Sequence, residues 1–335
     1  MITHTNPTWT NVTLSLLTSK GMSTIHTWPG NPGETVFVID SSGNYIVSEN
    51  VSHSYAGSVL SKITPEGART VIYKFAPGIQ AAAEAIDSEG NYIAAEYVGN
   101  YNGGHNVSEY AGRLSKITPD GVRTVIANVT APNGLAIDQF GNYLVTQTIW
   151  PWMNLLSKVY PNGTLKVIYN FTQGSWPDWV AVDSSGNYVV NLFDGHEICL
   201  VTPDGVERTV ATEVAGPYDT VIDSDGNYIV SVCNDNDLIR ISPAGVRTVL
   251  YNFSTYVVPG EIQVISAGDL KGAPTTTTIT PTSTMTTKPQ TGTTTTYTES
   301  AATGRSVDYT LYAVAGVVAV AFILAAAAFV LRRRH

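Results

Sequence analysis

The chain has 335 residues, a formal net charge of −9 and only 13% charged residues. This acidic, sparsely charged composition offers no basic surface and argues against nucleic acid as a partner. It contains no P-loop, dinucleotide fingerprint or Cys-x-x-Cys pair, so nothing in it indicates a nucleotide-dependent or thiol-redox enzyme.

The N-terminal segment resembles half of a repeat unit. Residues 16–25 align with residues 116–125, which read as the outer β-hairpin of a later unit. The inner part that should precede this hairpin is missing. No charged-then-apolar signal peptide precedes Asn11. We therefore expect either a start further upstream or a protein that is anchored to a membrane at its C-terminal end and keeps its repeat units in the cytoplasm.

Five copies of the phrase Asp-x-x-Gly-Asn-Tyr divide most of the chain into repeats. They begin at Asp40, Asp87, Asp138, Asp183 and Asp223, at spacings of 47, 51, 45 and 40 residues. Such spacings are too long for most helical solenoids and match the four-stranded blade of a β-propeller. Asp can bond its own backbone and Gly can adopt positive φ, so turn chemistry explains the phrase better than catalysis does.

A second turn in each unit provides the remaining two strands. It occurs at Pro65, Pro119, Pro161, Pro203 and Pro243, each followed two residues later by Gly. A degenerate inner strand and turn return at residues 261–268, so the first and last segments should share one blade. The sequence thus predicts an all-β, six-bladed β-propeller over residues 1–271, closed by both ends of the chain and without open strand edges.

Function is expected on the face opposite the repeated turns, where the connections vary. Five residues before each turn Asp, where the inner strand meets the central channel, the units read Thr35, Ala82, Asn133, Asp178, Tyr218 and, in the degenerate unit, Glu261. Asn133, Asp178 and Glu261 carry oxygen ligands. More acids are expected nearby, namely Glu34, Glu84 and Asp219 on the same segments and Glu49 and Glu96 at the ends of second strands. Such a ring repels itself unless a cation neutralises it or some groups hold protons.

At these residues the chain resembles the propellers of the regucalcin (SMP-30) and gluconolactonase family, and more loosely NHL-repeat and streptogramin-lyase propellers. Pro132-Asn133-Gly134-Leu135-Ala136 resembles a family motif whose Asn binds a divalent metal. Pro177-Asp178 resembles an element whose Asp is a metal ligand implicated in lactone hydrolysis, and Glu261 corresponds to a metal-binding Glu. The resemblance implies a calcium, magnesium or zinc site at Glu261, Asn133 and Asp178, with Asp178 as the catalytic residue.

The chain also departs from that family. Ala82 stands where the family often has a substrate-facing Asn, and Trp179 replaces the Gly after Asp178. The segment from Gly43 to Glu49 resembles the streptogramin-lyase repeat, but no histidine matches a catalytic position. Asn133 and Asp178 have an alternative role as turn caps. Beside the metal ligands, the expected ligand-binding residues are Glu84, Glu96, Glu49, Trp179, Tyr218 and Asp219.

Aromatic and sulfur-containing residues leave two further questions open. Trp150, Trp152, Trp176 and Trp179 fall on two adjacent blades, where they either form a stacking platform for a sugar or pack between blades. Cys199 and Cys233 fall in neighbouring blades, as a disulfide or as two buried thiols.

The C-terminal part predicts a stalk and an anchor. Residues 272–307 should be an extended, disordered stalk, because 15 of the 24 residues from 275 to 298 are Thr and no apolar periodicity is present. Residues 308–331 should form a transmembrane helix, since 309–331 are uncharged and span ~34 Å as a helix. The basic tail, 332–335, then lies in the cytoplasm and the propeller outside.

Seven Asn-x-Ser/Thr sequons also favour an extracytoplasmic glycoprotein. They are Asn11, Asn50, Asn106, Asn128, Asn162, Asn170 and Asn252. Two functions fit these expectations: a metal-dependent hydrolase of lactones or related esters, and a non-catalytic module that binds glycan, peptide or envelope components. The fold alone does not choose between them, and the oligomeric state stays open.

Overall fold

The computed structural model describes residues 2–5, 11–18, 21–29, 35–49, 57–98, 111–149, 152–253 and 258–263. The chain divides into two compact units, Met1–Ile279 and Thr280–His335, and all described residues lie in the first. These residues form β-strands and turns, and none of them is helical. The predicted all-β class is therefore confirmed for the part of the chain that the structure describes.

The described residues form 24 strands in six four-stranded antiparallel sheets. Five sheets consist of consecutive strands: β4 (Thr35–Ile39), β5 (Tyr45–Glu49), β6 (Val59–Ile63), β7 (Arg69–Lys74); β8 (Ile79–Ile86), β9 (Tyr92–Val98), β10 (Gly112–Ile117), β11 (Arg123–Asn128); β12 (Pro132–Ile137), β13 (Tyr143–Ile149), β14 (Met153–Val159), β15 (Leu165–Asn170); β16 (Pro177–Val182), β17 (Tyr188–Leu192), β18 (Glu197–Val201), β19 (Glu207–Ala211); and β20 (Pro217–Ile222), β21 (Tyr228–Val232), β22 (Asp237–Ile241), β23 (Arg247–Asn252).

The remaining sheet joins the two ends of the propeller segment. Its order is β24 (Val258–Ile262), β1 (Ile2–Thr5), β2 (Asn11–Thr18) and β3 (Gly21–Pro29). Only the innermost strand comes from the C-terminal side, and the other three come from the N-terminus. The sequence placed the missing inner part at residues 261–268, but the strand ends at Ile262, and β1 supplies the second strand.

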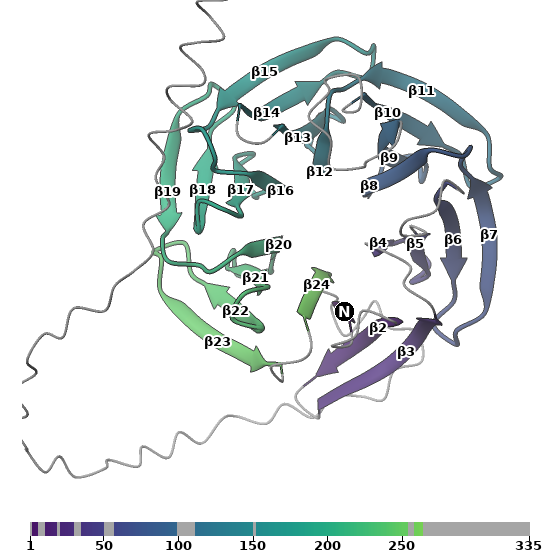
Figure 1. The fold of residues 1–335 in the computed structure, drawn as a ribbon, viewed down its shortest axis with the longest axis horizontal. Coiled ribbons are helices and arrows are strands. Elements are labelled where there is room, and N and C mark those ends of the chain that lie inside the picture. Colours follow the sequence, from purple (N-terminus) through teal and green to yellow (C-terminus); the bar gives the residue numbers. More distant parts are fainter. Residues whose placement is uncertain are drawn as a thin grey trace, which may run out of the picture. The chain divides into compact units, whose positions relative to one another are not determined.

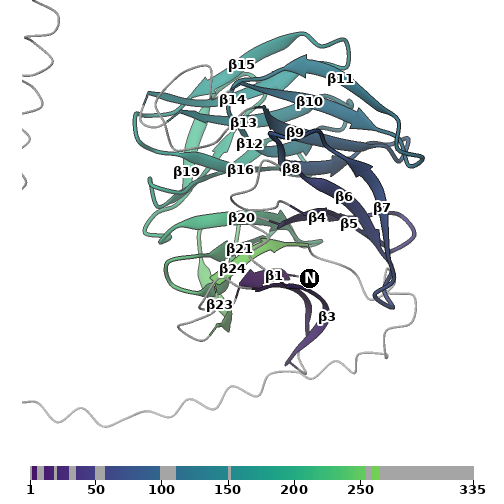
Figure 2. The same cartoon turned by 45° about the vertical axis from the view of Figure 1, so that its right-hand side comes forward.

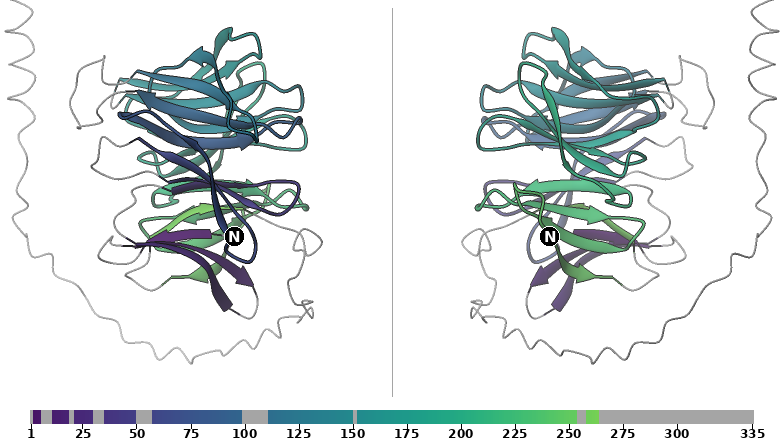
Figure 3. Two further views of the ribbon diagram at one scale, coloured as in Figure 1. Left: turned by 90° about the vertical axis from the view of Figure 1, so that its right-hand side faces the viewer. Right: turned by 90° about the vertical axis from the view of Figure 1, so that its left-hand side faces the viewer.

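The sheets are arranged around a ring (Figure 1). Their first strands, β4, β8, β12, β16, β20 and β24, lie innermost and contact one another in this cyclic order, with β24 returning to β4. The fourth strands lie outermost, and Figures 2 and 3 show the same sheets from the side. Because β24 pairs with β1 and contacts both β20 and β4, the ring has no open inner edge at the junction.

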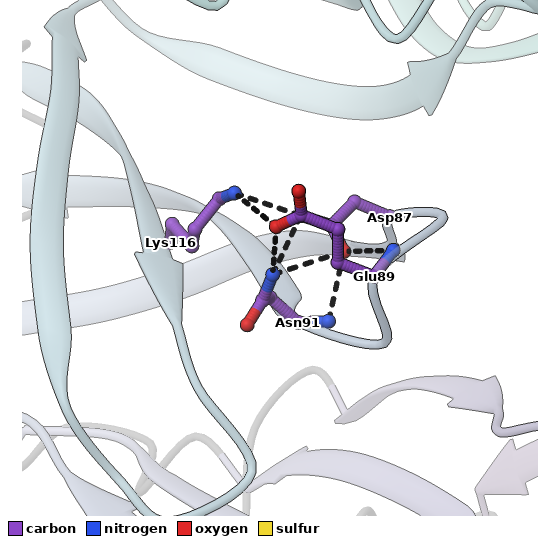
Figure 4. Close-up of polar contacts among 4 residues, drawn as sticks. All are labelled: Asp87, Glu89, Asn91 and Lys116. Carbon is purple, nitrogen blue, oxygen red and sulfur yellow. Dashed lines mark hydrogen bonds and ion pairs between the residues drawn. The ribbon is translucent and has the colours of Figure 1, made fainter.

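The Asp-x-x-Gly-Asn-Tyr phrase forms the turn between the first and second strands of a sheet. In the turn at Asp87, Oδ1 accepts the backbone N–H groups of Glu89 at 3.0 Å and Asn91 at 2.8 Å (Figure 4). Gly90 adopts a φ of 81°, and Lys116 of the third strand lies 3.0 Å from Asp87 Oδ2. Asp40, Asp138, Asp183 and Asp223 bond their turns in the same way. The interpretation of the phrase as a scaffold turn is confirmed.

Apolar side chains from facing sheets fill the space between blades. Between the second and third sheets, for example, Leu114, Leu135 and Val145 are at most 3% exposed. The outer hairpin of one sheet also rests on the outermost strand of the preceding one. At Gly121, which has a φ of 87°, a Cβ would lie 2.7 Å from the carbonyl oxygen of Ile72, so only glycine permits this contact. These contacts hold the blades rigidly side by side.

The structure does not describe the predicted transmembrane span or stalk, but it does describe both cysteines. Within the described residues no helix is long and apolar enough to cross a membrane, and the predicted span, 309–331, lies outside them, as does the stalk. Cys199 and Cys233 form no disulfide with each other. Their S–H groups donate to backbone carbonyls, Cys199 to Val190 at 3.6 Å and Cys233 to Pro259 at 3.3 Å.

Candidate functional site

Three successive inner strands begin with the same backbone turn. β12, β16 and β20 each start with a proline, and the residue before it has positive φ: 42° at Ala131, 51° at Trp176 and 68° at Gly216. Such φ values are strained for Ala and Trp. We name this side of the ring the inner-strand face; it contains the starts of β12, β16 and β20 and the connection from β13 to β14.

Asn133 and Asp178 lie on adjacent strands of this face. The Asn133 amide nitrogen donates to the Pro177 carbonyl at 3.5 Å, and its Oδ1 accepts a short hydrogen bond from the Tyr97 hydroxyl. Thr146 completes the junction, since its hydroxyl donates to the Asp178 carbonyl at 2.8 Å and accepts the Gly134 N–H at 2.7 Å. The structure therefore brings together these two predicted residues.

Glycine is needed where these two strands meet. A Cβ on Gly134 would lie 2.6 Å from the Asp178 carbonyl oxygen and 2.8 Å from the Trp179 Cα. Both are backbone atoms that cannot move aside. Packing between β12 and β16 thus requires glycine after Asn133.

Glu261 and Tyr218 belong to the next part of the ring. Glu261 lies on β24, which contacts β20, but its side chain is outside what the structure describes. Tyr218 is half-buried at the start of β20. Among the side chains that are described, no three His, Cys, Asp or Glu residues are placed to hold a metal ion. The predicted metal set thus stays a prediction.

Two predicted acids are engaged by arginines. The Glu96 side chain is fully buried, and its carboxylate lies 3.2 Å from Arg113 and 2.6 Å from Arg123. At the equivalent position of the first sheet, Glu49 pairs with Arg69 at 2.6 Å. In both sheets the acid lies in the second strand, and one of its arginine partners begins the fourth strand. The structure therefore places these carboxylates in ion pairs within their own sheets.

Glu84 is buried between the first two sheets. It is 2% exposed, and its Oε1 accepts a short hydrogen bond from the Ser48 hydroxyl of β5. Burial raises the pKa of Glu84 to about 8, although the Ser48 bond acts in the opposite direction. Its Oε2 has no partner among the described residues. A carboxyl group in this setting is largely protonated at neutral pH.

Asp219 is fully buried and joins two sheets. Its Oδ2 accepts the backbone N–H of Ile262 at 2.7 Å, and its own N–H donates to the Ser231 hydroxyl at 3.1 Å. Burial raises the pKa of Asp219 to about 7, against the lowering effect of the Ile262 and Thr220 backbone bonds. This acid, predicted as ligand-binding, lies beneath the inner-strand face.

The tryptophans divide into two kinds. Trp179 is 9% exposed and packs with Leu135 and Val145 between blades, as the packing alternative predicts. Trp152, in contrast, is 67% exposed on the connection from β13 to β14. Trp176 is half-buried, and its backbone N–H donates to Asn154 Oδ1 at 3.3 Å. Asn154 lies two residues after Trp152 in the chain. Trp150 lies outside the described residues.

Sequence reasoning missed the polar residues that connect the sheets. The position eight residues after each turn Asp reads Ser48, Ala95, Thr146, Asn191 and Ser231. Its described polar members bond inner strands: Ser48 bonds Glu84, Thr146 bonds Gly134 and Asp178, Asn191 bonds Thr220, and Ser231 bonds Asp219. A recurrent polar residue in an otherwise apolar strand was the available signal. Tyr97 gave no such signal.

No protein-family profile matches the chain, and no curated protein matches it in sequence. Solved structures do match. Virginiamycin B lyase from Staphylococcus aureus is 17% identical with a TM-score of 0.51, over 67% of this chain and 71% of that one. A Bacteroides caccae protein of unknown function is 14% identical with a TM-score of 0.54, over 78% of this chain and 100% of that one.

A chain of a nidogen/laminin complex is 11% identical with a TM-score of 0.56, over 72% of this chain and 89% of that one. The chain shares the β-propeller fold of these proteins. At this level of identity the likeness concerns the fold alone. Because the fold serves a lyase in one case and a protein complex in another, it is compatible with an enzyme and with a binding module.

Proposed function

We propose that this chain is a membrane-anchored, extracytoplasmic glycoprotein whose propeller binds a saccharide at the inner-strand face. The observation that carries the proposal is the grouping of Asn133 and Asp178 on adjacent strands, with Tyr97 bonded to Asn133 and the exposed Trp152 on the β13–β14 connection of the same face. The acids beneath them are engaged in protein contacts, so the face itself supplies the groups that can meet a ligand.

The chemistry of these groups suits a neutral sugar. Amide, carboxylate and phenol groups can donate to and accept from several hydroxyls. A tryptophan ring offers an apolar surface for the C–H face of a pyranose. The residues also follow one another through contacts: Tyr97 bonds Asn133, Asn133 bonds Pro177, and Trp176 bonds Asn154 near Trp152. These contacts join Tyr97, Asn133 and the start of β16, and Trp152 lies on the connection from β13 to β14 at the same face.

The proposed location rests on sequence features and on exposure. The Thr-rich stalk, the apolar segment 309–331 and the arginines after it support an anchor with the propeller outside. Three sequon asparagines, Asn128, Asn170 and Asn252, recur at the ends of the outermost strands β11, β15 and β23 and are exposed there.

A glycan array probed with the full chain in detergent tests the binding function, followed by titration of the best saccharide. Asn133→Ala and Trp152→Ala should each weaken binding at least about tenfold. Phe140→Ala is the matched control, since Phe140 is 76% exposed on a turn at the opposite face and should leave binding unchanged. Absence of any saccharide binding, or equal effects of the Trp152 and Phe140 variants, would overturn the proposal.

A metal-dependent lactone or ester hydrolase is the second candidate. It is favoured by the adjacency of Asn133 and Asp178 and by the place of Glu261 on β24 in the same ring. An all-oxygen donor set suits calcium or magnesium better than zinc. Asn133 would have to exchange its Tyr97 hydrogen bond for the cation. The metal would polarise the carbonyl and activate water, while Asp178 would assist proton transfer.

Calorimetric titration with calcium, magnesium and zinc, followed by lactone-hydrolysis assays, tests this candidate. Metal-dependent hydrolysis that disappears in Asp178→Ala would favour the hydrolase. Saccharide binding without metal uptake or hydrolysis would leave the binding module as the function.

A further inference from the structure

One backbone N–H group recurs in the inner strands, four residues before the turn Asp. In β12 the N–H of Gly134 donates to the Thr146 hydroxyl at 2.7 Å, and in β20 the N–H of Asp219 donates to the Ser231 hydroxyl at 3.1 Å. In both sheets the hydroxyl belongs to the second strand, eight residues after the turn Asp. In these two sheets the rule is therefore that the second strand provides the acceptor from within the sheet.

The sheet that joins the chain ends cannot follow this rule. Ile262 occupies the equivalent position on β24, and its register partner on β1 is Ile2. Ile2 is buried and has no hydroxyl. A buried backbone N–H that loses its partner destabilises the folded state.

The missing acceptor comes from the neighbouring sheet. Asp219 of β20 extends its carboxylate to the Ile262 N–H at 2.7 Å, within the range of a charge-assisted hydrogen bond. The corresponding residues in the other described sheets are Val36, Ala83, Gly134 and Trp179, none of which has a side-chain acceptor. Of these residues only Asp219 has a carboxylate, and its strand, β20, contacts β24.

A second contact supports the same strand. The Cys233 S–H, just beyond β21, donates to the Pro259 carbonyl of β24 at 3.3 Å. Both contacts run from the β20–β23 sheet to β24, which otherwise pairs only with the short strand β1. The last inner strand is consequently held from two sides.

We propose that Asp219 is the latch of the ring: it replaces the hydroxyl that Ile2 lacks and fixes β24, including the peptide bond between Glu261 and Ile262, against β20. The role is one of positioning. It determines the position of the β24 backbone at Glu261, independently of what the inner-strand face binds.

Amide hydrogen exchange of the full chain, read residue by residue, tests the latch. In Asp219→Ala the Ile262 amide should exchange at least about tenfold faster than in the parent, whereas the Gly134 amide should be unchanged. Asp219→Asn keeps an amide oxygen as acceptor and should retain most of the protection. Thr146→Val is the reciprocal control, because it should release Gly134 and leave Ile262 protected.

The decisive variant restores the missing hydroxyl. Ile2→Thr places it where Thr146 and Ser231 lie in their own sheets. In combination with Asp219→Ala it should recover the protection of Ile262. Unchanged Ile262 exchange in Asp219→Ala, or no recovery in the double variant, would overturn the proposal. If Asp219→Ala does not fold, the double variant should fold, and its failure would count against the latch.

Discussion

Glu84 and Glu96 show how differently two buried carboxyl groups can be satisfied in one propeller. Glu96 is surrounded by Arg113 and Arg123, whereas Glu84 has only the Ser48 hydroxyl. The two arginines compensate the cost of burying the Glu96 carboxylate. Glu84 has no such neighbours among the described residues, and its carboxyl group avoids a buried charge by keeping its proton.

The first residue-scale prediction concerns pH. The pKa of Glu84 is about 8 in the folded chain, above the usual range of a glutamate, so the folded state keeps a proton that the unfolded state loses. The contribution of Glu84 to the free energy of unfolding is therefore full below about pH 4 and is lost as the pH rises through about 8. Glu84→Gln should flatten this decline in urea denaturation series between pH 5 and pH 9.

Asp219, whose pKa of about 7 is also raised by burial, provides the comparison. Its contribution declines over a lower pH range. Asp219→Asn should therefore leave the decline near pH 8 in place, whereas Glu84→Gln should remove it. An identical pH profile for the parent and Glu84→Gln would contradict the assigned protonation.

The second residue-scale prediction compares two equivalent ion pairs. Glu96→Ala leaves two arginines without their buried carboxylate and should lower the free energy of unfolding by about 3 kcal/mol. Glu49→Ala breaks a pair whose arginine side chain is 34% exposed, and should cost only about 1 kcal/mol. Urea denaturation at neutral pH measures both losses. Equal losses would show that burial does not distinguish the pairs.

At the scale of strands and turns, local sequence patterns were informative. The Asp-x-x-Gly-Asn-Tyr turns follow from the hydrogen-bonding capacity of Asp and the positive φ of Gly, both of which are properties of single residues. Contacts between sheets were harder to predict from the sequence. The bond from Tyr97 to Asn133 joins residues 36 positions apart, and no periodicity in the sequence couples them. The turns were thus predictable, whereas the bond between Tyr97 and Asn133 was not.

Gly134 supports a prediction at this scale. In Gly134→Ala, the added methyl group would collide with backbone atoms of β16, so β12 and β16 must separate. Because Asn133 and Asp178 lie at this junction, ligand affinity should fall together with stability, by at least about 2 kcal/mol in the latter. The control is Ala83→Gly at the equivalent position of β8, which should cost about 1 kcal/mol or less. Calorimetry and ligand titration measure both effects.

For the whole propeller, the sequence predicted that the two ends share one sheet, and the structure places β24 beside β1. The bounds predicted for the inner strand of that sheet were wrong. The sequence placed this strand and its turn at residues 261–268, whereas β24 spans Val258–Ile262 and pairs with β1. The short segment Ile2–Thr5 carries too few residues for a repeat signal, so its strand could not be recognised.

The proposed membrane anchor yields a prediction for the whole chain. The full chain should remain with membranes after alkaline carbonate extraction, because 309–331 contains no charged residue. A variant that lacks 309–335 should be found in the soluble fraction. Protease added to intact cells should cleave the Thr-rich stalk and release the propeller. Protection of the stalk in intact cells would instead indicate the cytoplasmic orientation.

The sheet that joins both ends of the propeller segment also affects folding during synthesis. Of the described strands, β1 is synthesised first and β24 last, more than 250 residues later. Until then β1 lacks its inner neighbour and exposes an unsatisfied edge, to which a strand of another nascent chain could pair. Chaperone dependence during synthesis should therefore persist until β24 has left the ribosome, and slow translation of the segment before it should favour aggregation.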